Sequence, residues 1–104
     1  MITEKNLTEL QELAEAGIKV ELAGANSFRV YGFYKSGDAL IDFNAMSITT
    51  RYDTIRLFEE DDELLRIITW LNYDWWDRSK DRHDGWKEPD ANWARFYEKF
   101  NILS

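Results

Sequence analysis

The chain has 104 residues, 44% hydrophobic and 15% aromatic, which is enough apolar material for one core and excludes a disordered polymer. Its net charge of −7 disfavours direct DNA or RNA binding, because a negative field repels phosphates. The absence of cysteine excludes disulfides and thiolate metal sites. Residues 1–12 lack the apolar segment of a signal peptide, and no apolar run has the length of a membrane span. We therefore expect a soluble, cytoplasmic protein.

The first predicted element is a helix that begins after a cap at Thr3 or Asn6 and ends near Ala16, with Gly17 just beyond it. A helix this short is marginal alone, so it must pack against the rest of the domain. We expect Leu7, Leu10, Leu13 and Ala14 on its apolar face, and Glu9, Glu12 and Glu15 in solvent.

Residues 18–58 switch to the period-two alternation that is typical of β-strands. A fourth extended stretch lies within 47–58, where Asp53 obscures the register. The short connections predict antiparallel pairing. Three clearer strands are expected at 18–22, 28–34 and 39–43, and strict alternation in the second places Phe28, Val30 and Tyr34 on one face and Arg29, Tyr31 and Phe33 on the other.

A long helix is expected from about Asp61 to near Arg82, preceded by a run of five acids. Acids at a helix start are stabilised by the macrodipole, which explains much of this run without any function. The helical spacing predicts a sheet-facing stripe of Leu64, Ile67, Ile68, Leu71 and Trp75, with Leu65 and Trp76 on its flank.

A last helix is expected to follow the loop at 83–88, with Pro89 in its first turn and an end near Asn101. Its apolar face would carry Trp93, Phe96, Tyr97 and Phe100. The sequence thus predicts one α+β domain over residues 1–104. It would consist of an N-terminal helix, a three- or four-stranded antiparallel sheet, and two C-terminal helices packed on that sheet.

The sequence offers little for catalysis or cofactors. His83 lies between Asp81 and Asp84, which would raise its pKa and orient it, but no serine or cysteine nucleophile and no glycine-rich phosphate loop accompany it. Asp77, Asp81 and Asp84 suit Mg²⁺ or Ca²⁺ by chemistry, yet they lack the EF-hand pattern. We expect a non-enzymatic protein without cofactors; whether His83 or its neighbours bind a metal is left open.

The acidity is concentrated in the C-terminal half, where residues 59–104 carry −5 against −2 for residues 1–58. On the long helix Glu63, Asp74, Asp77 and Asp81 project to one face, with Trp70 among them. Large exposed aromatic residues usually mark contacts. Two other interpretations stay open: the acidity merely aids solubility, and the last helix or the loop at Trp86 covers Trp70.

Rows of carboxylates on a rigid helix can imitate nucleic-acid phosphates in front of a basic groove. We therefore hypothesise an inhibitor that binds a basic, nucleic-acid-handling host protein, in the host cytoplasm, without contacting nucleic acid or membrane. The candidate partner-binding residues are Glu59, Glu60, Asp61, Asp62, Glu63, Trp70, Asp74, Asp77 and Asp81.

The order of elements, with residues 18–24 (IKVELAG) and the turn at 35–38 (KSGD), resembles that of small phage-encoded inhibitors of Cas9, the type II-A anti-CRISPR proteins. The C-terminal stretch, residues 75–82 (WWDRSKDR) with 85–90 (GWKEPD), looks like the endings of small proteins from phages of Gram-positive bacteria. The resemblance implies a DNA mimic that occupies the site where Cas9 reads duplex DNA beside its target. Five tryptophans and the extra extended segment at 47–58 depart from that group.

A second hypothesis belongs to a different class. The tryptophans would form an apolar interface of a structural or regulatory adaptor of phage origin, which self-associates as a homodimer. Salt separates the two hypotheses, because binding by a mimic weakens with ionic strength whereas an apolar contact hardly responds.

Overall fold

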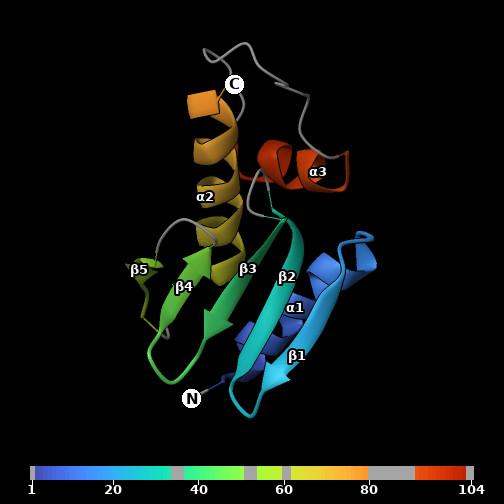
Figure 1. Ribbon diagram of the computed structural model, residues 1–104. Helices are drawn as coiled ribbons and strands as arrows, with labels where there is room; N and C mark the ends of the chain where they lie inside the picture. The colour runs from blue at the N-terminus through green and yellow to red at the C-terminus, as the bar shows by residue number, and fades with distance from the viewer. Residues whose placement is uncertain (1, 34–36, 51–53, 60–61, 80–90, 103–104) are drawn as a thin grey trace.

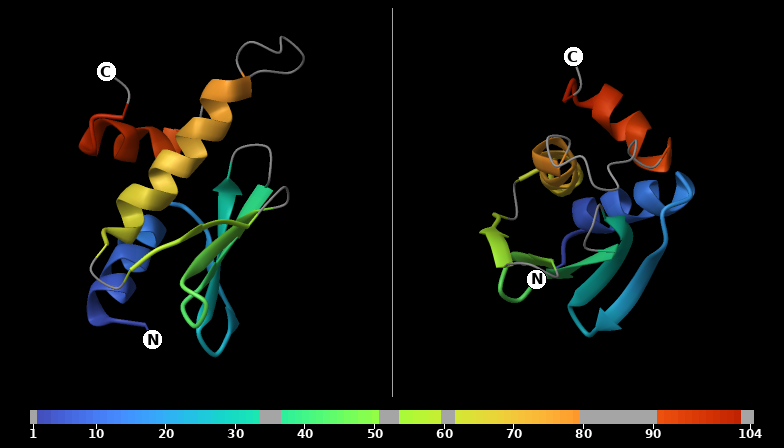
Figure 2. Two further views of the ribbon diagram at one scale, coloured as in Figure 1. Left: turned by 90° about the vertical axis from the view of Figure 1, so that its left-hand side faces the viewer. Right: turned by 45° about the horizontal axis from the view of Figure 1, so that its top comes forward.

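The computed structural model describes residues 2–33, 37–50, 54–59, 62–79 and 91–102, with backbone alone at 55–57, 75–79 and 91. It is an α+β fold in which three helices lie on one face of a twisted antiparallel sheet (Figures 1 and 2). This confirms the predicted fold class. In chain order the elements are α1 (Glu4–Glu15), β1 (Val20–Gly24), β2 (Ser27–Phe33), β3 (Gly37–Asp42), β4 (Ser47–Thr50), β5 (Thr54–Leu57), α2 (Leu64–Ser79) and α3 (Ala91–Lys99).

The sheet is a meander in which each strand pairs with the next one in the chain. The extended stretch expected within 47–58 forms two strands, β4 and β5, which pair with each other and bring the sheet to five strands. Ile41 pairs with Phe28 on one side and Ile48 on the other. This row faces the helices, and Ile41 and Ile48 are fully buried.

Both ends of α1 follow the sequence-based prediction. Thr3 is the N-cap: its hydroxyl accepts the Asn6 N–H, and the Asn6 side chain accepts the Thr3 N–H. At the other end Gly17 takes φ +94°, and the N–H groups of Gly17 and Ile18 donate to the carbonyls of Ala14 and Leu13. This Schellman motif turns the chain directly into β1.

The buried face of α1 differs from the expected one. Leu10 and Leu13 are buried as predicted, but Leu7 and Ala14 are exposed, and Glu9 is buried with Asn6. The reason is that α1 packs against α2 as well as the sheet, so its buried face turns toward Glu9. The Glu9 carboxylate accepts the Leu65 N–H of α2 at 2.7 Å.

In β2 the predicted alternation is wrong at Phe33. Gly32 has φ +78°, and the register with β3 shifts between Tyr31 and Phe33. Such a bulge places two successive residues opposite one and reverses the alternation. Phe33 therefore points into the core, where it meets Trp93 of α3 edge to face at 6.3 Å.

The buried face of α2 is wider than the predicted stripe. Leu64, Ile68 and Leu71 are buried as expected, and Ile67 is half-buried. Leu65, expected on the flank, is fully buried because α1 covers that side. The Trp75 and Trp76 side chains lie outside the described part of the chain. No helix among the described residues is long and apolar enough to cross a membrane.

The last helix buries Trp93, Phe96 and Tyr97, as its spacing predicts. It ends in a second Schellman motif: Asn101 has φ +54°, and the N–H groups of Asn101 and Ile102 donate to Glu98 and Tyr97. The motif reverses the chain so that Ile102 returns toward α2.

Candidate partner-binding surface

Trp70 is a partly exposed tryptophan on the solvent side of α2. Its side chain is 45% exposed, whereas Trp93, the other tryptophan whose side chain is described, is fully buried. Ile68 and Leu71 are buried, and the helical period places Trp70 on the side of α2 that faces away from them. The interpretation in which α3 covers Trp70 is therefore wrong, and the loop at Trp86 lies outside the described residues.

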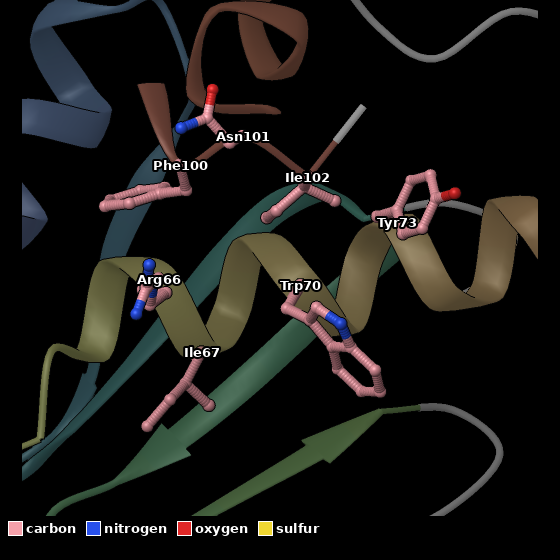
Figure 3. A pocket seen from close by; sticks show the side chains of 7 residues that line it. All are labelled: Arg66, Ile67, Trp70, Tyr73, Phe100, Asn101 and Ile102. Carbon is pink, nitrogen blue, oxygen red and sulfur yellow. The ribbon is translucent and has the colours of Figure 1, made fainter. Parts of the chain in front are cut away.

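A pocket of about 530 Å³ adjoins Trp70. Its volume is within the range of sites that hold a ligand or an anchoring side chain. Figure 3 shows Trp70 and Tyr73 reaching out from α2, with the segment that follows α3 lying along the other wall. The lining residues are Arg66, Ile67, Trp70, Tyr73, Phe100, Asn101 and Ile102.

The wall at 100–102 exists because of the left-handed residue Asn101. That turn ends α3, and Ile102 beyond it lines the pocket together with Trp70 and Tyr73 of α2. Sequence reasoning assigned Phe100 to the buried face of the last helix and missed its role, with Ile102, in this pocket. The signal that would have revealed the pocket is an asparagine directly after a helix, which is the second choice after glycine at that position.

The pocket is aromatic with a basic end. Arg66 is the one charged residue among the described residues of its lining, and its guanidinium lies 5.9 Å from the centre of the Phe100 ring. Lys99 lies 5.4 Å from the same ring and also forms an ion pair with Glu12 of α1. These cations hold the Phe100 ring by cation–π attraction.

The predicted acidic face is present in part. Glu63 is exposed directly before α2, and Asp74 is half-buried one turn beyond Trp70. At 100° per residue, both project within about 40° of Trp70. The described face is mixed, because Arg66 interrupts it. Asp81 and the side chain of Asp77 lie outside the described residues.

The acidic run forms a turn before α2. The Asp62 carboxylate accepts the Glu59 N–H at 2.9 Å, and the Asp62 N–H donates to the Glu59 carbonyl. The helix begins at Leu64 and not at Asp61 as expected, so these two acids shape the turn and stand outside the first helical turn. Glu60 and Asp61 lie outside the described residues.

No group of three or more metal-ligating side chains occurs among the described residues. His83, Asp81 and Asp84, the residues considered for chemistry, lie outside them, as does the Asp77 side chain. Comparisons of the chain with protein-family models, curated proteins and solved structures found no match.

Proposed function

We propose that this chain is a non-enzymatic binding protein that inhibits a basic, nucleic-acid-handling protein, with Trp70 as the anchor of the contact. The observation that carries the proposal is the half-exposed Trp70 beside an aromatic pocket. Leaving so large an apolar side chain in water forgoes the stabilisation of burial. Tryptophan is also among the residues that most often dominate binding energy at protein interfaces.

Charge supports a basic partner. The chain carries −7; Glu63 directly precedes α2, and Asp74 lies on α2 one turn beyond Trp70. Acids at the rim of an aromatic anchor raise the association rate with a positively charged surface. The resemblance to small Cas9 inhibitors makes a Cas9-type nuclease the specific partner that we propose.

The first test reverses one charge in the surface and one outside it. Asp74→Lys and Glu15→Lys each change the net charge from −7 to −5, but Glu15 lies on α1, away from Trp70. We expect Asp74→Lys to weaken binding to an immobilised Cas9-type nuclease by about tenfold or more, and Glu15→Lys to have a smaller effect. Surface plasmon resonance measures both, and circular dichroism verifies the folds.

Equal losses in the two variants would show that net charge alone drives binding, against a specific surface. Salt provides the second reading of the same experiment. The wild-type association rate should fall as ionic strength rises, because exposed charges are screened.

The aromatic lining of the pocket favours a second candidate, an adaptor whose contact is chiefly apolar. In that case both charge reversals would leave the affinity within about twofold of wild type, since rim charges contribute little to such a contact. The salt dependence would be flat as well.

A further inference from the structure

The outer edge of β1 is an open strand edge, since β1 pairs with β2 and ends the described sheet on that side (Figure 1). The Tyr31 N–H donates to the Lys19 carbonyl, and Glu21 pairs with Arg29. Backbone groups alternate in direction along an antiparallel ladder. Lys19 and Glu21 therefore direct their backbone N–H and C=O groups toward β2. Val20 and Leu22 direct the same groups outward, away from the sheet.

Two of the three most exposed large hydrophobic side chains in the described part of the chain belong to β1 and to α1, the helix that contacts β1. Leu22 of β1 is 65% exposed, and Leu7 of α1 is 49% exposed. Leu7 lies about 200° around α1 from Glu9, which contacts α2, so Leu7 faces away from α2. Leu22 pairs with Phe28, in the row that faces the helices. An open edge bordered by apolar side chains is a template for strand pairing.

We propose that β1 pairs with β1 of a second copy of this chain, antiparallel, with Val20 opposite Val20 of that copy. A two-fold axis perpendicular to the sheet relates the copies, as in other isologous dimers. The outward backbone groups of Val20 and Leu22 then gain partners, and the two sheets become one. This inference does not rest on the proposed function, because Trp70 lies on α2 and not on this edge.

Charge complementarity favours this register, and it favours a second copy of the chain as the strand that pairs with the β1 edge. With Val20 opposite itself, Lys19 of each copy lies opposite Glu21 of the other. Both side chains are exposed and already attract each other within one chain at 3.4 Å. Shifting the pairing by one residue on each chain, so that Glu21 lies opposite Glu21, would instead place like charges face to face, which is unfavourable.

The same symmetry accounts for the apolar side chains. A two-fold axis perpendicular to the sheet keeps both α1 helices on the same face of the joined sheet. Leu22 of each copy, whose row faces the helices, and the exposed Leu7 of α1 then lie on this same side of the joined sheet. The dimer thereby brings to one face the hydrophobic surface that each monomer exposes to solvent.

The test begins with the oligomeric state of the full chain, measured by analytical ultracentrifugation over a concentration series that reaches the solubility limit. We expect a reversible dimer. Val20→Pro removes an outward N–H that β2 does not use, so it leaves the internal ladder intact and blocks the edge. We expect this variant to be monomeric, and Trp70→Ala to dimerise like the wild type.

Charge exchange tests the register itself. Lys19→Glu and Glu21→Lys each replace two attractive pairs by two repulsive ones, so each variant alone should dimerise at least about tenfold more weakly. Mixed together, the two variants should form a heterodimer, because every facing pair is again opposite in sign. The double variant Lys19→Glu with Glu21→Lys should recover the wild-type dimer.

Three results would overturn the proposal: a monomeric wild type throughout the series, a dimer that survives Val20→Pro, or an equimolar mixture that associates no better than its components. Circular dichroism of every variant ensures that a monomeric result reflects the edge and not unfolding.

Discussion

At the scale of single residues, Glu9 shows how a tertiary contact overrides a surface pattern. Its side chain is 7% exposed, and its carboxylate accepts the N–H of Leu65, the second residue of α2. A carboxylate from α1 thus caps the start of α2, where free N–H groups and the helix dipole favour an anion. Helical spacing on α1 alone assigned Glu9 to solvent, because it contains no information about α2.

The burial of Glu9 predicts a pH dependence of stability. Desolvation raises the pKa of Glu9 above its ordinary value of 4.5, and the nearby Glu63 charge adds to this, although the Leu65 N–H, Asn6 and Lys5 act in the opposite direction. The folded protein therefore holds this proton more tightly than the unfolded chain. The corresponding stabilisation is complete below pH 4.5 and is lost as the pH rises through the raised pKa.

We predict that Glu9→Gln removes this loss, since the amide oxygen still accepts the Leu65 N–H and carries no charge. Urea unfolding between pH 4 and pH 7 measures it. The free energy of unfolding of the glutamine variant, measured relative to that of the wild type, should increase as the pH rises. Parallel curves for the two proteins would contradict the assigned role of Glu9.

At the scale of elements, the sequence predicted what neighbouring residues determine. The caps of α1 follow from Thr3, Asn6 and Gly17, and the buried positions of β3 follow from simple alternation. The bulge at Gly32 was not predictable from alternation, which assumes a regular strand; the signal for it is the glycine inside the strand, beside which the Trp93 indole of α3 packs. The pocket beside Trp70 was missed because it joins segments about thirty residues apart.

Gly32 of β2 and Gly37 of β3 allow the cost of left-handed backbone to be measured separately from the cost of a steric contact. Gly32 and Gly37 both have positive φ, at +78° and +85°. A Cβ on Gly32 would lie 3.2 Å from the Trp93 indole nitrogen, whereas a Cβ on Gly37 would have no neighbour within 4 Å among the residues that the structure describes. We predict that Gly37→Ala costs about 1–2 kcal/mol of stability, the cost of left-handed backbone in a residue with a Cβ.

Gly32→Ala should cost about 1 kcal/mol more than Gly37→Ala, because the Trp93 ring must also move. Thermal unfolding of both variants provides the comparison, and each kcal/mol corresponds to a shift in Tm of about 4–8 °C at this chain length. Equal losses of stability in the two variants would show that the contact with Trp93 does not add to the cost of replacing Gly32.

At the scale of the whole molecule, the two proposed contacts use different parts of the fold. The β1 edge lies at one end of the sheet (Figure 1), whereas Trp70 and the pocket beside it lie on α2 (Figure 3). Dimerisation therefore leaves Trp70 free to bind another protein. Added salt screens both the repulsion between two copies of net charge −7 and the exposed Lys19–Glu21 pairs between them. The dimer should therefore respond to salt less than the binding of a basic partner, which weakens.

The most direct test of the proposed function is the affinity of Trp70→Ala for a Cas9-type nuclease, measured by titration calorimetry beside the wild type. Because Trp70 is half-exposed, we expect the variant to keep the wild-type circular dichroism. Removal of an anchoring tryptophan should raise the Kd by about thirtyfold or more. Binding of the variant with wild-type affinity would contradict the role of Trp70, and failure of the wild type to bind would contradict the partner.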